Sequence, residues 1–156
     1  MISYIFFTIL LLCAMICATM ISITDFRTRI IPDAFLFPLM LIGLILITFF
    51  NFPTSISDAV TGATFGYLMA SIIGFSFDWR MRRHNPNADI PIGMGDIKLI
   101  GVGGIWLGTT GLAWALIIAC LSGAIWGRAK HQKFIPFAPF FMIGGILSLI
   151  ARLFLI

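Results

Sequence analysis

Long apolar runs separated by short polar segments make up most of this sequence. A membrane-spanning helix needs about 20 mostly apolar residues, and six segments approach or reach that length. We expect spans at residues 2–24, 34–50, 56–77 and 90–107, a fifth from the turn at 108–111 to about 126, and a sixth from about 136 to the end. The pattern predicts an all-α polytopic membrane protein with about six transmembrane helices, in a single domain over residues 1–156.

The ends of the first two predicted spans carry the clearest local signals. No Lys or Arg precedes Arg27, whereas a cleavable signal peptide has positive charge ahead of its apolar region. We therefore expect the first segment to be retained as a helix. Pro32 and Asp33 suit the start of the second helix, with Asp33 as its N-cap, and residues 51–55 suit a turn before the third.

Composition supports the membrane interpretation. Of the 156 residues, 60% are hydrophobic and 10% are charged, and the mean hydropathy is +1.09. Soluble domains have about 45–50% apolar and about 25% charged residues, so a soluble or disordered chain is excluded. The three cysteines lie inside apolar runs without a paired C-x-x-C, which leaves no basis for a disulfide framework or a zinc site.

The distribution of basic residues predicts the orientation of the chain. If the six segments alternate in direction, all but one of the ten Lys and Arg residues fall on one side; the exception is Arg152. The basic clusters lie at residues 27–29, in a polar loop at 78–89, at Lys98 and in a loop at 128–133. The positive-inside rule makes this side cytoplasmic and puts both termini outside. Clusters of this kind reflect membrane topology, so the net charge of +4 does not indicate a nucleic-acid partner.

Two of the six carboxylates stand out. An ionisable group inside or at the edge of a membrane span is a functional candidate. Asp25 ends the first apolar segment, Asp96 lies a third of the way into the fourth, and the predicted topology puts both near the cytoplasmic face. The other four have ordinary roles available as exposed or capping groups: Asp33, Asp58, Asp78 and Asp89.

A close pair of carboxylates can perform acid–base chemistry. The two groups share a proton, so that one can act as a base and the other as an acid, as in aspartic proteases. Gly93 and Gly95 would let a substrate backbone or a neighbouring helix approach Asp96. The structural alternative is an ion pair between Asp96 and Lys98 or a nearby Arg. A serine protease is disfavoured because Ser122 has no histidine in any predicted span to activate it.

Three segments resemble the type IV prepilin peptidases, which are membrane aspartic proteases of the G-x-G-D class. Residues 25–33 (DFRTRIIPD) resemble the first signature, an Asp at the end of a span followed by Ile/Leu-Pro-Asp/Asn. Residues 93–99 (GMGDIKL) resemble the second, G-x-G-D-x-K-L. Residues 135–140 (IPFAPF) resemble an Ile-Pro-Phe-Gly-Pro segment, with Ala138 where Gly is usual. We expect that departure to touch no catalytic group.

The resemblance implies both a mechanism and a substrate. Asp25 and Asp96 would be the catalytic aspartates, with Pro32, Asp33, Gly93, Gly95 and Lys98 as supporting motif residues. The substrates would be precursors of type IV pilins or of secretion-system pseudopilins, cut between a short basic leader and an apolar helix. The enzyme would lie in the bacterial inner membrane among lipids, act at its cytoplasmic face and need no cofactor or metal. Larger members methylate the product through a region with paired C-x-x-C motifs, so we expect this chain to be a peptidase only.

Two other classes of function remain open from the residues alone. In a small transporter, Asp25 and Asp96 would relay protons or bind a cation; in a structural subunit, neither would be needed.

The extent of the fourth span is a separate question. From Asp96 to Leu107 a helix would measure about 18 Å, short of the roughly 30 Å hydrocarbon core. We therefore expect this helix to begin near Ile90, with Asp96 inside the membrane, in preference to a partly re-entrant segment.

Overall fold

The computed structural model describes residues 2–84, 92–131 and 135–155, and every regular element in these ranges is an α-helix. The helices are α1 (Ile2–Thr28), α2 (Asp33–Phe50), α3 (Ile56–His84), α4 (Met94–Lys130) and α5 (Phe137–Leu155). The first four are long and apolar enough to cross a membrane, and α5 contains a shorter apolar stretch, Phe137–Arg152. The all-α prediction holds for the described residues, and the chain is a multi-pass membrane protein.

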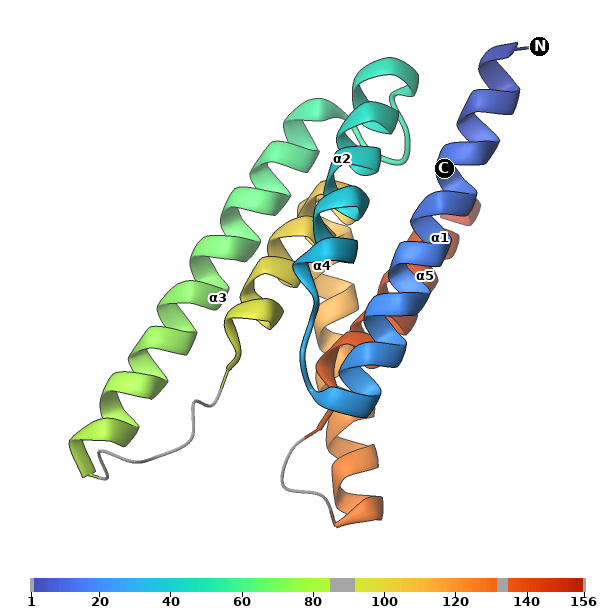
Figure 1. Cartoon of the computed structure of the whole chain (residues 1–156). Helices are drawn as coiled ribbons and strands as arrows, with labels where there is room; N and C mark the ends of the chain where they lie inside the picture. Colours follow the sequence, from blue (N-terminus) through green and yellow to red (C-terminus); the bar gives the residue numbers. More distant parts are fainter. Residues whose placement is uncertain (1, 85–91, 132–134, 156) are drawn as a thin grey trace.

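α4 is broken at Gly108, whose φ of 66° and ψ of −174° are not helical. The part before Gly108 runs toward the end of the molecule where both termini lie, and the part after it returns (Figure 1). The predicted turn at 108–111 is thus concentrated in one residue. Glycine suits this position because a positive φ is costly for residues with a Cβ.

The start of α4 differs from the sequence-based expectation. The helix begins at Met94, after Gly93 in an extended conformation, and not near Ile90. The main-chain N–H of Gly93 donates to the Asp96 side chain at 3.3 Å, which is one half of a capping box. Asp96 therefore lies in the first turn of the helix, and the segment from Met94 to the break is only about 21 Å long.

Two charged side chains support the break in α4. The Asp58 carboxylate accepts a hydrogen bond from the Thr109 main-chain N–H at 2.9 Å, so it caps the second part of α4. The Arg152 guanidinium donates to the Leu107 carbonyl and pairs with Asp58, both at 3.4 Å. Arg152, the basic residue that the charge distribution left on the other side, thus has a structural partner at that end of the bundle.

Two predicted loops are partly helical. Residues 78–84 of the predicted polar loop form the last turns of α3, and Arg128 and Lys130 lie in the last turn of α4. An Asp78–Arg82 ion pair at 2.7 Å and the Arg83 guanidinium, 4.0 Å from the centre of the Trp79 ring, stabilise the end of α3. The rest of the polar loop, including Asp89, lies outside the described residues, as does Lys133.

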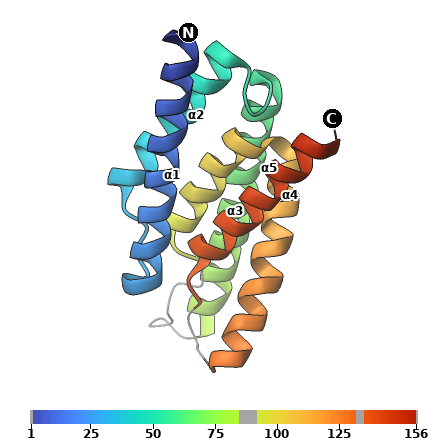
Figure 2. The ribbon, with the colours of Figure 1, turned by 90° about the vertical axis from the view of Figure 1, so that its right-hand side faces the viewer.

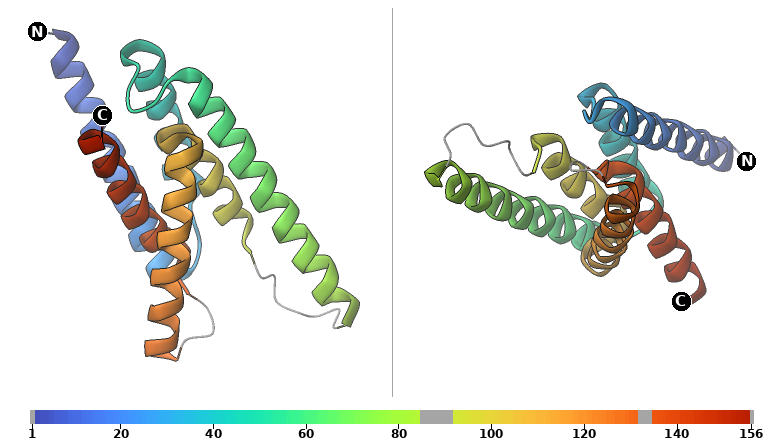
Figure 3. Two further views of the ribbon diagram at one scale, coloured as in Figure 1. Left: turned by 180° about the vertical axis from the view of Figure 1, so that it is seen from behind. Right: turned by 90° about the horizontal axis from the view of Figure 1, so that it is seen from below.

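α4 is the centre of the bundle. α3 and α5 pack along it, and α1 contacts α2 and α5. Figure 2 shows α5 crossing in front of the second part of α4, and Figure 3 shows α1 and α5 on one side of α4 and α3 on the other. Close packing of α3 uses Gly62, where a Cβ would lie 2.7 Å from the Gly108 carbonyl carbon. The G-x-x-x-G spacing of α3 and the glycine-rich stretch at 101–104 therefore serve helix packing.

The predicted functional residues lie at the ends of helices. The end of α1 and the starts of α2 and α4 lie toward the end of the bundle opposite the two termini (Figure 1). The basic residues at the ends of α1, α3 and α4 lie toward this end too. Each of the three signature segments contains a helix terminus at this end: residues 25–33 contain the end of α1 and the start of α2, residues 93–99 the start of α4, and residues 135–140 the start of α5.

Candidate active site

Asp25 is held in place by the start of another helix. It lies in the last turn of α1 and is 4% exposed. Its Oδ2 accepts a hydrogen bond from the Ala138 main-chain N–H at 2.8 Å, in the first turn of α5. A helix N-terminus favours a carboxylate because its first N–H groups lack partners within the helix. The Arg29 side chain adds a nearby positive charge.

This contact bears on the departure at Ala138, which we expected to touch no catalytic group. Residue 138 binds the Asp25 carboxylate through its main-chain N–H, so the side chain that differs is not part of the hydrogen bond. The Ala138 side chain is fully buried, so the position has room for a methyl group. The substitution is tolerated because the hydrogen bond uses the main chain. The two prolines of the segment, Pro136 and Pro139, were the available signal for a helix start at this point.

Asp96 lies toward the same end of the bundle as Asp25, although the two residues belong to different helices. It is partly buried in the first turn of α4, and its Oδ2 accepts the hydrogen bond from Gly93. The two aspartates that the sequence singled out therefore lie toward the same end of the bundle, Asp25 in the last turn of α1 and Asp96 in the first turn of α4.

Lys98 pairs with Asp33 and not with Asp96. Its Nζ lies 2.9 and 2.7 Å from the two Asp33 carboxylate oxygens. This geometry removes the structural alternative in which Lys98 neutralises Asp96. It also corrects the expected role of Asp33, because the N-cap of α2 is Pro32 and Asp33 is the first helical residue. The ion pair joins the start of α2 to the first turns of α4.

A second contact joins the same two segments. Ile31, which precedes Pro32 in the α1–α2 connection, is buried against Gly95. A Cβ at Gly95 would lie 3.0 Å from the Ile31 Cβ, which is closer than ordinary packing allows. At Gly93 a Cβ would meet only the Asp96 Oδ2, at 3.5 Å. Gly95 thus permits the close approach that brings the segment after Asp25 against the segment before Asp96.

A shallow hollow lies beside Asp25. It has a volume of about 350 Å³ and is lined by Ser22, Ile23, Phe26 and Arg27 of α1 and by Pro139 of α5. The Phe26 ring also packs edge-on against Trp126, with centroids 6.1 Å apart.

Other chemistries find less support at this site. In the described ranges, no group of three His, Cys, Asp or Glu side chains could hold a metal ion. Ser122 donates its hydroxyl to the Ile118 main-chain carbonyl at 2.6 Å, as an ordinary helical serine does. A pair of adjacent carboxyl groups, in contrast, can hold a water between a base and an acid.

Comparison with known proteins agrees with these motifs. Residues 5–128 match the model of the type IV leader peptidase family. Prepilin leader peptidase/N-methyltransferases of Pectobacterium carotovorum subsp. carotovorum and Burkholderia pseudomallei (strain 1026b) are 30% and 34% identical to the chain over 137 and 143 residues. These alignments cover 83% and 86% of this chain but 47% and 44% of the relatives, so the chain spans about half their length. No solved structure matches. The chain belongs to the type IV leader peptidase family.

Proposed function

We propose that this chain is an intramembrane aspartic endopeptidase that removes the leader from type IV prepilins or pseudopilins. Family membership supports the reaction class and the kind of substrate. We further propose that it acts at the cytoplasmic face of the bacterial inner membrane, because the end of the bundle that carries Asp25 and Asp96 also carries most of the basic residues.

The proposed mechanism uses Asp25 and Asp96 as one acid–base unit. The ionised carboxylate takes a proton from a water molecule, and the water oxygen forms a bond to the peptide carbonyl carbon. The protonated carboxyl group stabilises the resulting tetrahedral intermediate and the C–N bond then breaks. The carboxyl group that received the proton from water gives it to the leaving amine nitrogen, the new carboxyl end is released, and the pair returns to its singly protonated state.

One observation carries this proposal above the others. Asp25 is buried at the end of α1 and Asp96 is partly buried at the start of α4, while Lys98, the nearest basic residue in the motif, pairs with Asp33. Buried ionisable groups at the edge of a membrane span are functional candidates. The Asp33–Lys98 pair and the Ile31–Gly95 contact support a positioning role for the surrounding motif residues.

Co-expression with a candidate precursor tests the proposal. A precursor with a basic leader and an apolar helix should shift to lower mass on a gel only when this chain is present. N-terminal sequencing of the product should start at the first residue of the apolar helix. An unchanged precursor, together with proton or cation flux through liposomes containing the purified chain, would favour a transporter instead.

A further inference from the structure

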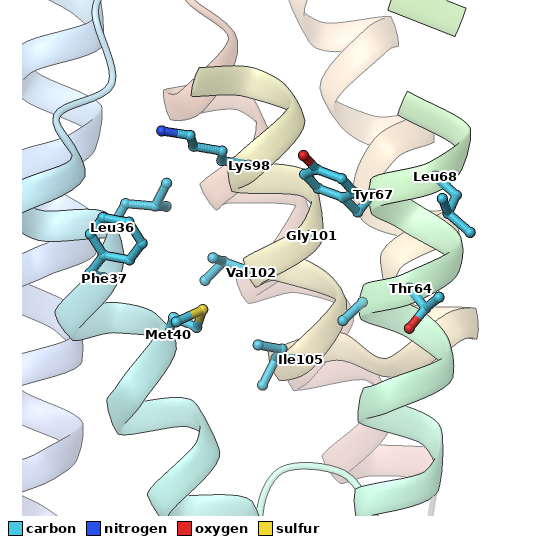
Figure 4. Close-up of a pocket in the computed structure, with 11 residues that line it drawn as sticks. Leu36, Phe37, Met40, Thr64, Tyr67, Leu68, Lys98, Gly101, Val102 and Ile105 are labelled. Carbon is cyan, nitrogen blue, oxygen red and sulfur yellow. The ribbon is translucent and has the colours of Figure 1, made fainter. Parts of the chain in front are cut away.

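A groove lies on the side of α4 that faces away from Asp96. It has a volume of about 450 Å³ and runs between α2, α3 and the part of α4 before Gly108. Lys98, Gly101, Val102 and Ile105 form its α4 wall, and these residues follow the i, i+3, i+4, i+7 spacing of one helix face. Figure 4 shows this wall between the side chains of α2 and α3, with Lys98 at one end.

The groove is open at its side because α2 and α3 make few contacts with each other. Phe37 of α2 and Leu68 of α3 line the groove and are 51% and 52% exposed. At Gly101 the α4 wall packs against α3, since an added Cβ would lie 3.4 Å from the Tyr67 Cβ. In a membrane protein, an open apolar groove of this kind is reached from the lipid.

We propose that this groove binds the apolar helix of the precursor that the chain cleaves. This inference rests on the proposed function. Three helix faces surround the groove, as they surround a neighbouring helix in a bundle, and an amphipathic or apolar helix docks in such a groove through one face.

The position of the groove relative to Asp96 favours this occupant. Lys98 lies at the mouth of the groove and is two residues beyond Asp96 in the same turns of α4. A helix seated between α2 and α3 would therefore end beside the start of α4. The polar segment before it would pass the exposed Gly93 toward Asp96, which is the order of leader, cleavage site and helix in the proposed substrate.

A lipid acyl chain fits the same space less well. An acyl chain in the groove would bring its phosphate to the mouth, where an unpaired cation would be expected to bind it. Lys98 is the cation at that position, and both oxygens of Asp33 lie within 2.9 Å of its Nζ. The apolar walls remain suited to a side-chain surface without a charged headgroup.

Photo-crosslinking tests the occupant directly. A benzoylphenylalanine replacing Leu68 in an Asp96→Asn background should form an adduct with the helix of an added precursor. The matched control replaces Met69, which is exposed on the same helix but does not line the groove. We expect at least tenfold more adduct from position 68. Equal yields, or adducts to lipid alone when the precursor is present, would overturn the inference.

Steady-state kinetics provide a second test that separates the groove from the chemistry. Thr64→Trp should fill the groove and raise the KM for the precursor at least tenfold, whereas Met69→Trp should leave KM within twofold of the wild type. Equal KM values in two folded variants would overturn the groove while the proposed function stands. If the wild-type chain cleaves no precursor, the proposed function fails, and the adduct at position 68 still reports whether the groove binds the helix.

Discussion

The Asp58 carboxylate should contribute measurably to the stability of the helix bundle. It caps the second part of α4 through Thr109, and it pairs with Arg152, which also donates to the Leu107 carbonyl. Asp58→Ala removes the cap and the ion pair together. The Thr109 main-chain N–H then loses its charged partner, and Arg152, which still donates to Leu107, loses its carboxylate. The return of the chain at this break is therefore less well fixed.

The size of the effect follows from these contacts. Replacing an N-cap aspartate by alanine costs about 0.5–2 kcal/mol. The pair with Arg152 is about one-third exposed, so it adds at most about 1 kcal/mol. We expect a total loss of about 2 kcal/mol in the free energy of unfolding. For a chain of this size that corresponds to a fall in Tm of about 4–8 °C.

Thermal unfolding of the purified protein in detergent measures this change. Asp78→Ala is the matched control, because Asp78 makes an exposed i,i+4 pair with Arg82 at 2.7 Å, and such pairs contribute about 0.3–0.5 kcal/mol. Asp58→Asn should fall between the two, since Asn caps about as well as Asp but lacks the charge. Equal shifts for Asp58→Ala and Asp78→Ala would refute the role given to Asp58.

Three further predictions concern the candidate site. Asp33→Asn and Lys98→Met should each slow precursor processing without abolishing it, and the double variant should be no worse than either single one, because both remove the same ion pair; additive losses would contradict this. Gly95→Ala should reduce processing more than Gly93→Ala, because only the Gly95 methyl group meets the Ile31 Cβ, and equal losses would argue against this contact. The processing rate should rise and then fall with increasing pH, since the pair needs one base and one acid; a single transition would contradict a two-carboxylate mechanism.

The helical class could be predicted from the sequence, and two aspartates could be singled out as candidates, because both have strong local signals. Apolar runs of about 20 residues define spans directly, and a carboxylate at the edge of such a run is rare enough to identify. Asp25 and Asp96 were therefore recognised individually, and the end of the bundle at which each lies followed from the order of the spans.

The remaining features depend on contacts between distant segments. The hydrogen bond from Ala138 to Asp25 joins residues 113 positions apart, and it involves a main-chain group that no side-chain pattern reveals. Asp33 has the residue type of an N-cap, but Lys98, 65 positions away, competes for its carboxylate. The polar residues 78–84 were expected to form a loop, but they belong to α3. Charged residues spaced i, i+4 can stabilise a helix, so a polar segment is not necessarily a loop.

Processing by aspartate variants tests the central proposal most directly. Purified wild-type protein, Asp25→Asn, Asp96→Asn and the control Asp78→Asn are each incubated with a prepilin precursor in liposomes. We expect cleavage by the wild type and by Asp78→Asn, and at least a hundredfold loss in both Asp25→Asn and Asp96→Asn while all four proteins insert and remain folded. Cleavage at the wild-type rate by either the Asp25 or the Asp96 variant would contradict the assignment of these two residues as the catalytic pair.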